Sequence, residues 1–300
     1  MELWVPITIL AAFFQNLRSV LQKSLQGSLG TRGATYVRFL YGLPVAVAYL
    51  AGVVLLRGDS LPAFGGLFVF YTVAGGLAQI LATAALLASF RSRNFAAGVA
   101  YAKTEPIQAA LFGFVVLGDA IPALGFLAIL LGLLAVLVLT VGMDIFRRDF
   151  WVTGLHDRAA LFGVLAGAGF GIAAVFYRGA GLALPHGDFI LRSAFTLACT
   201  LVFQTVAMTL EILWAERGLL RAVFAQWRRG ALVGLVSVVA SAGWFAAGVL
   251  HSAAYVRAVG QVELVFAAAS SVLIFREKLE GREIVGMLLL VASIVLLVTT

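Results

Sequence analysis

Long apolar runs separated by short polar breaks extend along the whole chain. A helix that crosses the hydrocarbon core of a bilayer needs roughly 20 apolar residues, and runs of about that length recur throughout this sequence. They cover residues 4–24, 35–56, 63–88, 95–117, 121–142, 160–181, 188–213, 231–250, 254–275 and 282–300. The pattern therefore predicts an all-α membrane protein with ten transmembrane helices.

The composition excludes a water-soluble protein of this length. Hydrophobic residues make up 62% of the 300 residues, charged residues make up 12%, and the mean hydropathy is +1.05. A soluble chain keeps about a quarter of its residues charged, so most of this surface must face lipid. The chain has 21 Lys and Arg against 14 Asp and Glu, but the basic residues lie mainly between the apolar runs. That placement is a topology signal, so we expect membrane lipids and no nucleic acid as partners.

An internal repeat appears when the sequence is compared with itself at a shift of 158 residues. Glu105 then falls on Glu263, and Asp119 falls on Glu277. In both places an acid lies within an apolar run, a second acid follows at a turn, and a long apolar helix is expected next. The chain is therefore expected to consist of two five-helix units.

The boundaries of these units follow from the longest polar segment. We expect the first unit to cover residues 1–143 and the second to cover 160–300. The segment between them, 144–159, holds aromatic residues among its charges, which is typical of a linker that lies at the membrane interface. These aromatic residues are Phe146, Phe150 and Trp151.

The two repeated segments resemble the drug/metabolite transporter superfamily, in its EamA type. The resemblance is carried by AYAKTEPIQAALFGFVVLGDAIPALGFLAILLGLLAVLVL in the first half and VGQVELVFAAASSVLIFREKLEGREIVGMLLLVASIVLLV in the second. Leu264 stands where the family pattern has proline after the acid. The resemblance implies ten helices in two inverted five-helix repeats and a transport function, and the superfamily handles amino acids, nucleotide sugars, lipids and cationic drugs. Fold analogy does not choose among these substrates.

The distribution of basic residues predicts the orientation in the membrane. The even-numbered connections hold only Arg57 and Arg257, whereas the odd-numbered connections are rich in arginine. The basic residues of the odd connections are Arg32, Arg91, Arg93, Arg147, Arg148, Arg158, Arg217, Arg221, Arg228, Arg229, Arg276, Lys278 and Arg282. The positive-inside rule then places both termini outside a bacterial inner membrane. Halves that begin on opposite faces are antiparallel, which is typical of alternating-access transporters.

Two cations lie deep in the predicted spans and are the candidate anion-binding residues. A charge near the bilayer centre is costly, so Arg18 and Lys103 are expected to face the protein interior. Gln15 shares a helix face with Arg18 and extends the polar stripe. Aromatic residues near these positions complete the predicted substrate site: Tyr101, Trp244 and Tyr255. The cations nearer the helix ends can reach the head groups: Lys23, Arg38, Arg178 and Arg192.

The duplicated acids are the candidate coupling groups. Glu105 is expected to meet Arg18 or Arg257 and to stay ionised beside Lys103. Glu263 has fewer cations near it in the sequence, so it is the expected proton carrier. An ion-pair network that only locks helices together is the structural alternative. Two prolines lie within predicted spans, Pro44 and Pro106, and both are expected to kink their helices.

These features predict a secondary transporter that exports a small organic metabolite by alternating access. The expected substrate is an amino-acid-like or other anionic or zwitterionic amphipathic solute, and the expected energy source is the substrate gradient or proton exchange. The alternative is a lipid or lipid-linked sugar flippase of the same fold. The sequence shows no nucleophile with its base and no ligand cluster, so we expect no enzyme activity, no cofactor and no metal. We expect a monomer or a weak homodimer.

Overall fold

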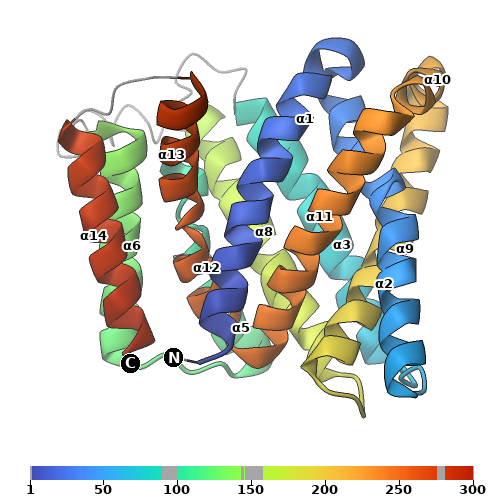
Figure 1. The fold of residues 1–300 in the computed structure, drawn as a ribbon. Helices are drawn as coiled ribbons and strands as arrows, with labels where there is room; N and C mark the ends of the chain where they lie inside the picture. Colours follow the sequence, from blue (N-terminus) through green and yellow to red (C-terminus); the bar gives the residue numbers. More distant parts are fainter. Residues whose placement is uncertain (1, 90–99, 143–144, 146–157, 276–280, 300) are drawn as a thin grey trace. The chain divides into compact units, whose positions relative to one another are not determined.

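The computed structural model describes residues 2–89, 100–142, 145, 158–275 and 281–299 (Figure 1). Across these ranges the regular secondary structure is helical, with no strand. The helices are α1 (Trp4–Leu40), α2 (Gly42–Arg57), α3 (Gly66–Ser89), α5 (Glu105–Leu117), α6 (Ala123–Thr140), α8 (Arg158–Leu182), α9 (Phe189–Ala215), α10 (Gly218–Ala225), α11 (Trp227–Leu250), α12 (Ala253–Gly260), α13 (Glu263–Phe275) and α14 (Gly281–Val298). The predicted interfacial linker 144–159 lies almost entirely outside the described residues.

Eight helical segments of the described chain are long and apolar enough to cross a membrane. They correspond to eight of the ten predicted spans, which makes the protein an α-helical, multi-pass membrane protein. The other two predicted spans, 95–117 and 254–275, are not continuous helices. The second is divided into α12 and α13, and in the first α5 begins only at Glu105. The full count of ten spans and the inverted layout stay predictions.

The first two predicted spans meet at a glycine. Helical hydrogen bonding continues from Trp4 to Leu40, but Gly30 has φ 61° and ψ −177°, a conformation that breaks the helix axis. Glycine adopts this positive φ without the penalty that a side chain would add. The amide of Gln22 donates to the carbonyl of Ala34 at 2.8 Å and ties the two sides of the kink together.

The described helices form two compact units, each drawn from both halves of the sequence. Unit 1 consists of residues 1–5, 77–176 and 251–300. Within it α6 packs along α14, and α5 packs against α12. The hydroxyl of Ser293 on α14 donates to the carbonyl of Ala128 on α6 at 2.8 Å, so a polar contact joins the two apolar helices.

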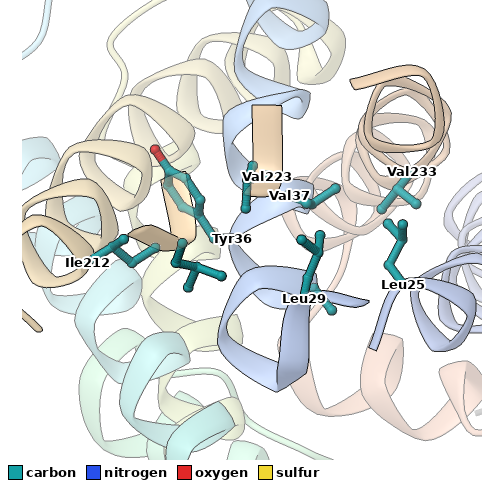
Figure 2. Close-up of a cluster of buried hydrophobic side chains, with 9 residues drawn as sticks. Leu25, Leu29, Tyr36, Val37, Ile212, Val223 and Val233 are labelled. Atoms are coloured by element: carbon teal, nitrogen blue, oxygen red, sulfur yellow. The ribbon is translucent and has the colours of Figure 1, made fainter. Parts of the chain in front are cut away.

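Unit 2 consists of residues 6–76 and 177–250. Its helices α2, α9 and α11 pack against one another. One of its cores gathers aliphatic side chains and a tyrosine from four helices (Figure 2): Leu25, Leu29, Tyr36 and Val37 of α1, Ile212 of α9, Val223 of α10 and Val233 of α11. The buried Tyr36 hydroxyl is not left unpaired, because it hydrogen bonds with the hydroxyl of Thr209 at 2.6 Å.

Large apolar side chains also cover the outer surface. On α14 the exposed residues recur every three or four positions: Ile284, Leu288, Val291 and Val295. Such a stripe is the outward face of a helix, and in a soluble protein an apolar patch of this size would need a covering partner. Lipid is the solvent that stabilises it here.

Candidate functional site

Two short helices of unit 1 begin directly at the duplicated acids. Glu105 is the first residue of α5, and Glu263 is the first residue of α13. Each follows a two-residue turn built from the same backbone bonds. In the first turn the N–H groups of Lys103 and Thr104 donate to Ala100 and Tyr101, and in the second those of Gln261 and Val262 donate to Ala258 and Val259. The shift of 158 residues that aligns the acids therefore also aligns the two breaks.

The prolines correct one expectation from the sequence. Pro106 is in the first turn of α5, and Pro44 is in the first turn of α2. A proline in a first turn interrupts no intrahelical hydrogen bond, because the N–H groups there have no partner within the helix. The two prolines therefore start helices and do not kink them. The interruption before Pro106 is the turn at Lys103 and Thr104.

The first acid is held by an arginine from another helix. Arg257 lies on α12, and its Nη2 donates to Oε2 of Glu105 at 2.9 Å, while its Nε forms an ion pair with Oε1. This side-on, two-point geometry suits the planar guanidinium. The Glu105 side chain is only 8% exposed, so the charge needs such a partner to remain buried.

The second acid pairs with the lysine beside the first. Nζ of Lys103 donates to Oε1 of Glu263 at 3.0 Å, and the two side chains are 20% and 24% exposed. The expected contact of Glu105 with Arg257 is therefore present, whereas Lys103, which was expected to keep Glu105 ionised, pairs with Glu263. Residues two apart do not face each other on a helix, so Lys103 reaches across to the other break.

The two ion pairs are reciprocal. Each acid lies at a helix N-terminus, where the helix dipole favours a negative charge, and each takes its cation from the opposite broken segment. We call this set of four residues the crossed ion pairs: Lys103 with Glu263, and Arg257 with Glu105. Such an arrangement can hold the two segments together, and one pair can open while the other keeps its contact.

Glycines of α8 bring a third helix close to the first break. A side chain at Gly167 would lie 3.0 Å from the carbonyl oxygen of Ala102, and one at Gly171 would lie 3.1 Å from the backbone nitrogen of Ala109. Small residues permit this approach between membrane helices. Gly167 and Gly171 are therefore packing positions.

The remaining predicted binding residues are divided between the units. In unit 2, Nε1 of Trp244 donates to Oε1 of Gln15 at 2.9 Å, and Arg18 is partly buried on the same helix as Gln15. Tyr101 is buried in unit 1, close to Lys103 in the chain. Because Arg18 and Lys103 belong to different units, their joint role in anion binding stays a prediction.

One aromatic cluster of unit 1 was only partly predicted. The His251 ring stacks on Trp4 with centroids 4.5 Å apart and lies 4.8 Å from the ring of Tyr255. His251 lies just before α12 and Tyr255 lies in its first turn, so the two are close in the chain, but the sequence gives no signal that Trp4 joins them. In unit 2, one of the cations expected near a helix end has a structural partner. Nη1 of Arg178 donates to the carbonyl of Gly248 at 2.7 Å near the end of α11.

Comparison with known proteins gives one similar fold and one family match over part of the chain. A solved structure described only as the crystal structure of a protein has a TM-score of 0.71 and 16% sequence identity, and the match covers 98% of this chain and 94% of that one. At this identity the likeness shows the fold alone. None of the curated proteins matches the sequence. Residues 157–299, which form the second half of the chain, match the EamA-like transporter family. This match confirms the resemblance expected from the repeated hairpins.

Proposed function

We propose that this membrane transporter exports a small anionic or zwitterionic organic metabolite across a bacterial inner membrane by alternating access. The single observation that carries the proposal is the set of crossed ion pairs at two helix breaks. Ionisable side chains within a membrane bundle are costly, and they mark substrate or ion pathways more often than packing. Discontinuous helices at corresponding places in two repeats are a common position for transport sites.

The two ion pairs have different strengths, which suggests different roles. Arg257 contacts Glu105 at two points, and that acid is the least exposed of the four residues. Lys103 is a compact point charge on a flexible stem, and its partner Glu263 is the more exposed acid. The proposal therefore assigns Lys103 to the carboxylate or phosphate of the substrate and Glu263 to the proton. Arg257 and Glu105 form the fixed pair.

Transport assays on purified protein in liposomes test this proposal. Thermal-shift screening in detergent first identifies a ligand, and flux of that ligand is then measured in proteoliposomes. Lys103→Met removes the charge and keeps much of the side-chain volume, so flux of an anionic or zwitterionic ligand should fall at least tenfold. Lys103→Arg is the charge-retaining control and should keep part of the flux. Full transport by Lys103→Met would refute the assignment.

The same proposal includes an orientation. The odd-numbered connections face the cytoplasm and both termini face outward, because the basic residues gather in the odd connections. This orientation would place α10, which follows the seventh predicted span, at the cytoplasmic surface. The proposed transport role, with no enzyme activity, rests on the crossed ion pairs and on the match of residues 157–299 to a transporter family.

A further inference from the structure

We propose that α10 and the arginines beside it form a binding surface for the head groups of anionic phospholipids. We call this the arginine surface, and it consists of Arg217, Arg221, Arg228 and Arg229 in unit 2. The inference does not depend on the transported substrate. It concerns a part of the protein that the crossed ion pairs do not include.

The position of α10 places it at the membrane interface. It connects the candidate spans Phe189–Ala215 and Trp227–Leu250, so both of its ends are fixed at the same edge of the bilayer. In Figure 1 α10 is seen end-on at the top of the picture, whereas α9 and α11 run down the picture from there. A short helix that lies across the ends of two spans is parallel to the membrane surface.

The inner face of α10 is fixed to unit 2. Val223 is buried in the core that contains Leu25 and Leu29 of α1 (Figure 2), and Leu219 belongs to the same core. The hydroxyl of Tyr41 also donates to the carbonyl of Val223 at 3.2 Å. These contacts determine which face points away from the protein, and that face carries Arg221 and Phe224, both exposed.

The outer face combines positive charge with aromatic side chains. All four arginines are exposed, whereas residues 214–229 contain a single acid, Glu216. Trp214 is 90% exposed, Phe224 57% and Trp227 56%. The guanidinium of Arg228 lies over the Trp227 ring, 5.4 Å from its centroid.

This combination fits a lipid surface better than a soluble anion. Tryptophan and phenylalanine at the edge of a span insert at the level of the head groups, and arginines beside them meet the phosphates. Each basic residue near an anionic leaflet contributes about 1 kcal/mol, which is about a fivefold change in affinity. Bare phosphate would gain nothing from the exposed aromatic side chains.

The test compares nanodiscs of phosphatidylcholine alone with nanodiscs that also contain phosphatidylglycerol. Thermal unfolding of the whole protein is followed in both, and bound phosphatidylglycerol is counted by native mass spectrometry. The variant Arg221→Gln/Arg228→Gln/Arg229→Gln removes three charges. Arg217 is left unchanged because its Nε donates to the carbonyl of Leu213 at 3.0 Å. The matched control replaces the same three residues with lysine and keeps the charge.

We expect phosphatidylglycerol to stabilise the wild type and the lysine variant, and affinity to fall about fivefold for each charge removed in the glutamine variant. Equal unfolding of all three proteins in pure phosphatidylcholine would show that the fold is intact. If the glutamine variant is less stable there, the count of bound lipid decides instead. The proposal is overturned if the glutamine variant keeps the phosphatidylglycerol response, or if inorganic phosphate alone reproduces it.

Discussion

Arg257 and Glu105 come from helices α12 and α5, and their side chains meet in a two-point ion pair with Nη2 of Arg257 2.9 Å from Oε2 of Glu105. The two residues are 152 positions apart in the chain, so the contact fixes a long-range arrangement within unit 1. Glu105 is 8% exposed, and its charge is separated from water by the helices around it. The loss of either partner therefore leaves a buried charge.

The first prediction follows from that burial. Arg257→Met should destabilise the protein by about 3–5 kcal/mol, because Glu105 would be left without its cation. The double variant Arg257→Met/Glu105→Gln should recover most of that loss, since it removes both charges. Unfolding in detergent and denaturant measures both effects.

A matched control is the exposed ion pair of Arg57 and Asp188, whose side chains are 39% and 45% exposed. Arg57→Met should cost less than about 1 kcal/mol. If Arg257→Met is no more destabilising than this control, the buried pair does not hold α5 and α12 together.

The second prediction separates the two acids by their role in transport. Glu263→Gln should abolish the pH dependence of flux, because Glu263 is the proposed proton carrier and is the more exposed of the two acids. Glu105→Gln should instead reduce ligand binding and leave the remaining flux dependent on pH. Proteoliposome flux measured between about pH 5 and 8 distinguishes the Glu263→Gln variant from the Glu105→Gln variant. A Glu263→Gln protein that responds to pH as the wild type does would leave that residue a structural role.

The sequence predicted the helical spans well because twenty-residue apolar runs have few other interpretations in a membrane protein. It also located the acids of the two ion pairs, since the repeat brought Glu105 and Glu263 into correspondence. It offered Arg257 as one of two partners for Glu105, which the structure shows, but it did not predict that Lys103 pairs with Glu263. Lys103 is close to Glu105 in the chain, but the turn at Lys103 and Thr104 directs the two side chains to different neighbours. Sequence distance is a poor guide where a helix is broken.

The aromatic neighbours show the same limit. His251 and Tyr255 are four residues apart in the chain, whereas Trp4 reaches them only through the fold of unit 1. Pro44 and Pro106 were predicted to kink helices because each lies inside a long apolar run. Hydropathy does not show where one helix ends and the next begins, and both prolines belong to first turns.

The third prediction concerns a close approach between helices of unit 2. A Cβ atom at Gly234 would lie 2.5 Å from the backbone carbonyl carbon of Tyr41, which cannot move aside as a flexible side chain could. Gly234→Ala should therefore destabilise the protein by about 1–3 kcal/mol. Gly52→Ala is the control, because nothing lies within 4 Å of its Cβ position, and it should be neutral or slightly stabilising. Equal melting temperatures for the two variants would contradict the packing of α11 on Tyr41.

The fourth prediction concerns stability at acid pH. Burial alone would raise the pKa of Asp188, but the backbone N–H of Leu191 and the guanidinium of Arg57 outweigh it, so the pKa lies below its ordinary value of 3.8. Asp188 therefore stabilises the folded state fully above that value, and the contribution is lost as the pH falls through the lowered pKa. Asp188→Asn should be less stable than the wild type by under about 1 kcal/mol near neutral pH, and the difference should vanish at low pH.

Melting curves of the two proteins in detergent, taken between about pH 2 and 6, check this prediction across the ordinary range of an aspartate. Arg57→Gln removes the ion pair but keeps the hydrogen bond from Leu191 to Asp188, so its pH dependence should be intermediate. A constant gap between Asp188→Asn and the wild type over the whole range would mean that the carboxylate charge contributes nothing.

The last prediction fixes the orientation with two serines of unit 2. Ser28 is exposed beside the kink at Gly30, and Ser60 is exposed between α2 and α3. The second predicted span, residues 35–56, lies between their positions, so the two should be accessible from opposite sides of the membrane. A Cys199→Ala background leaves no other cysteine, because the chain contains one. The basic odd-numbered connections predict that Ser28→Cys reacts with a membrane-impermeant maleimide only in inverted vesicles, and Ser60→Cys only in intact cells. The opposite result would reverse the orientation and keep the fold, whereas labelling of both from one side would show that α2 does not cross the membrane.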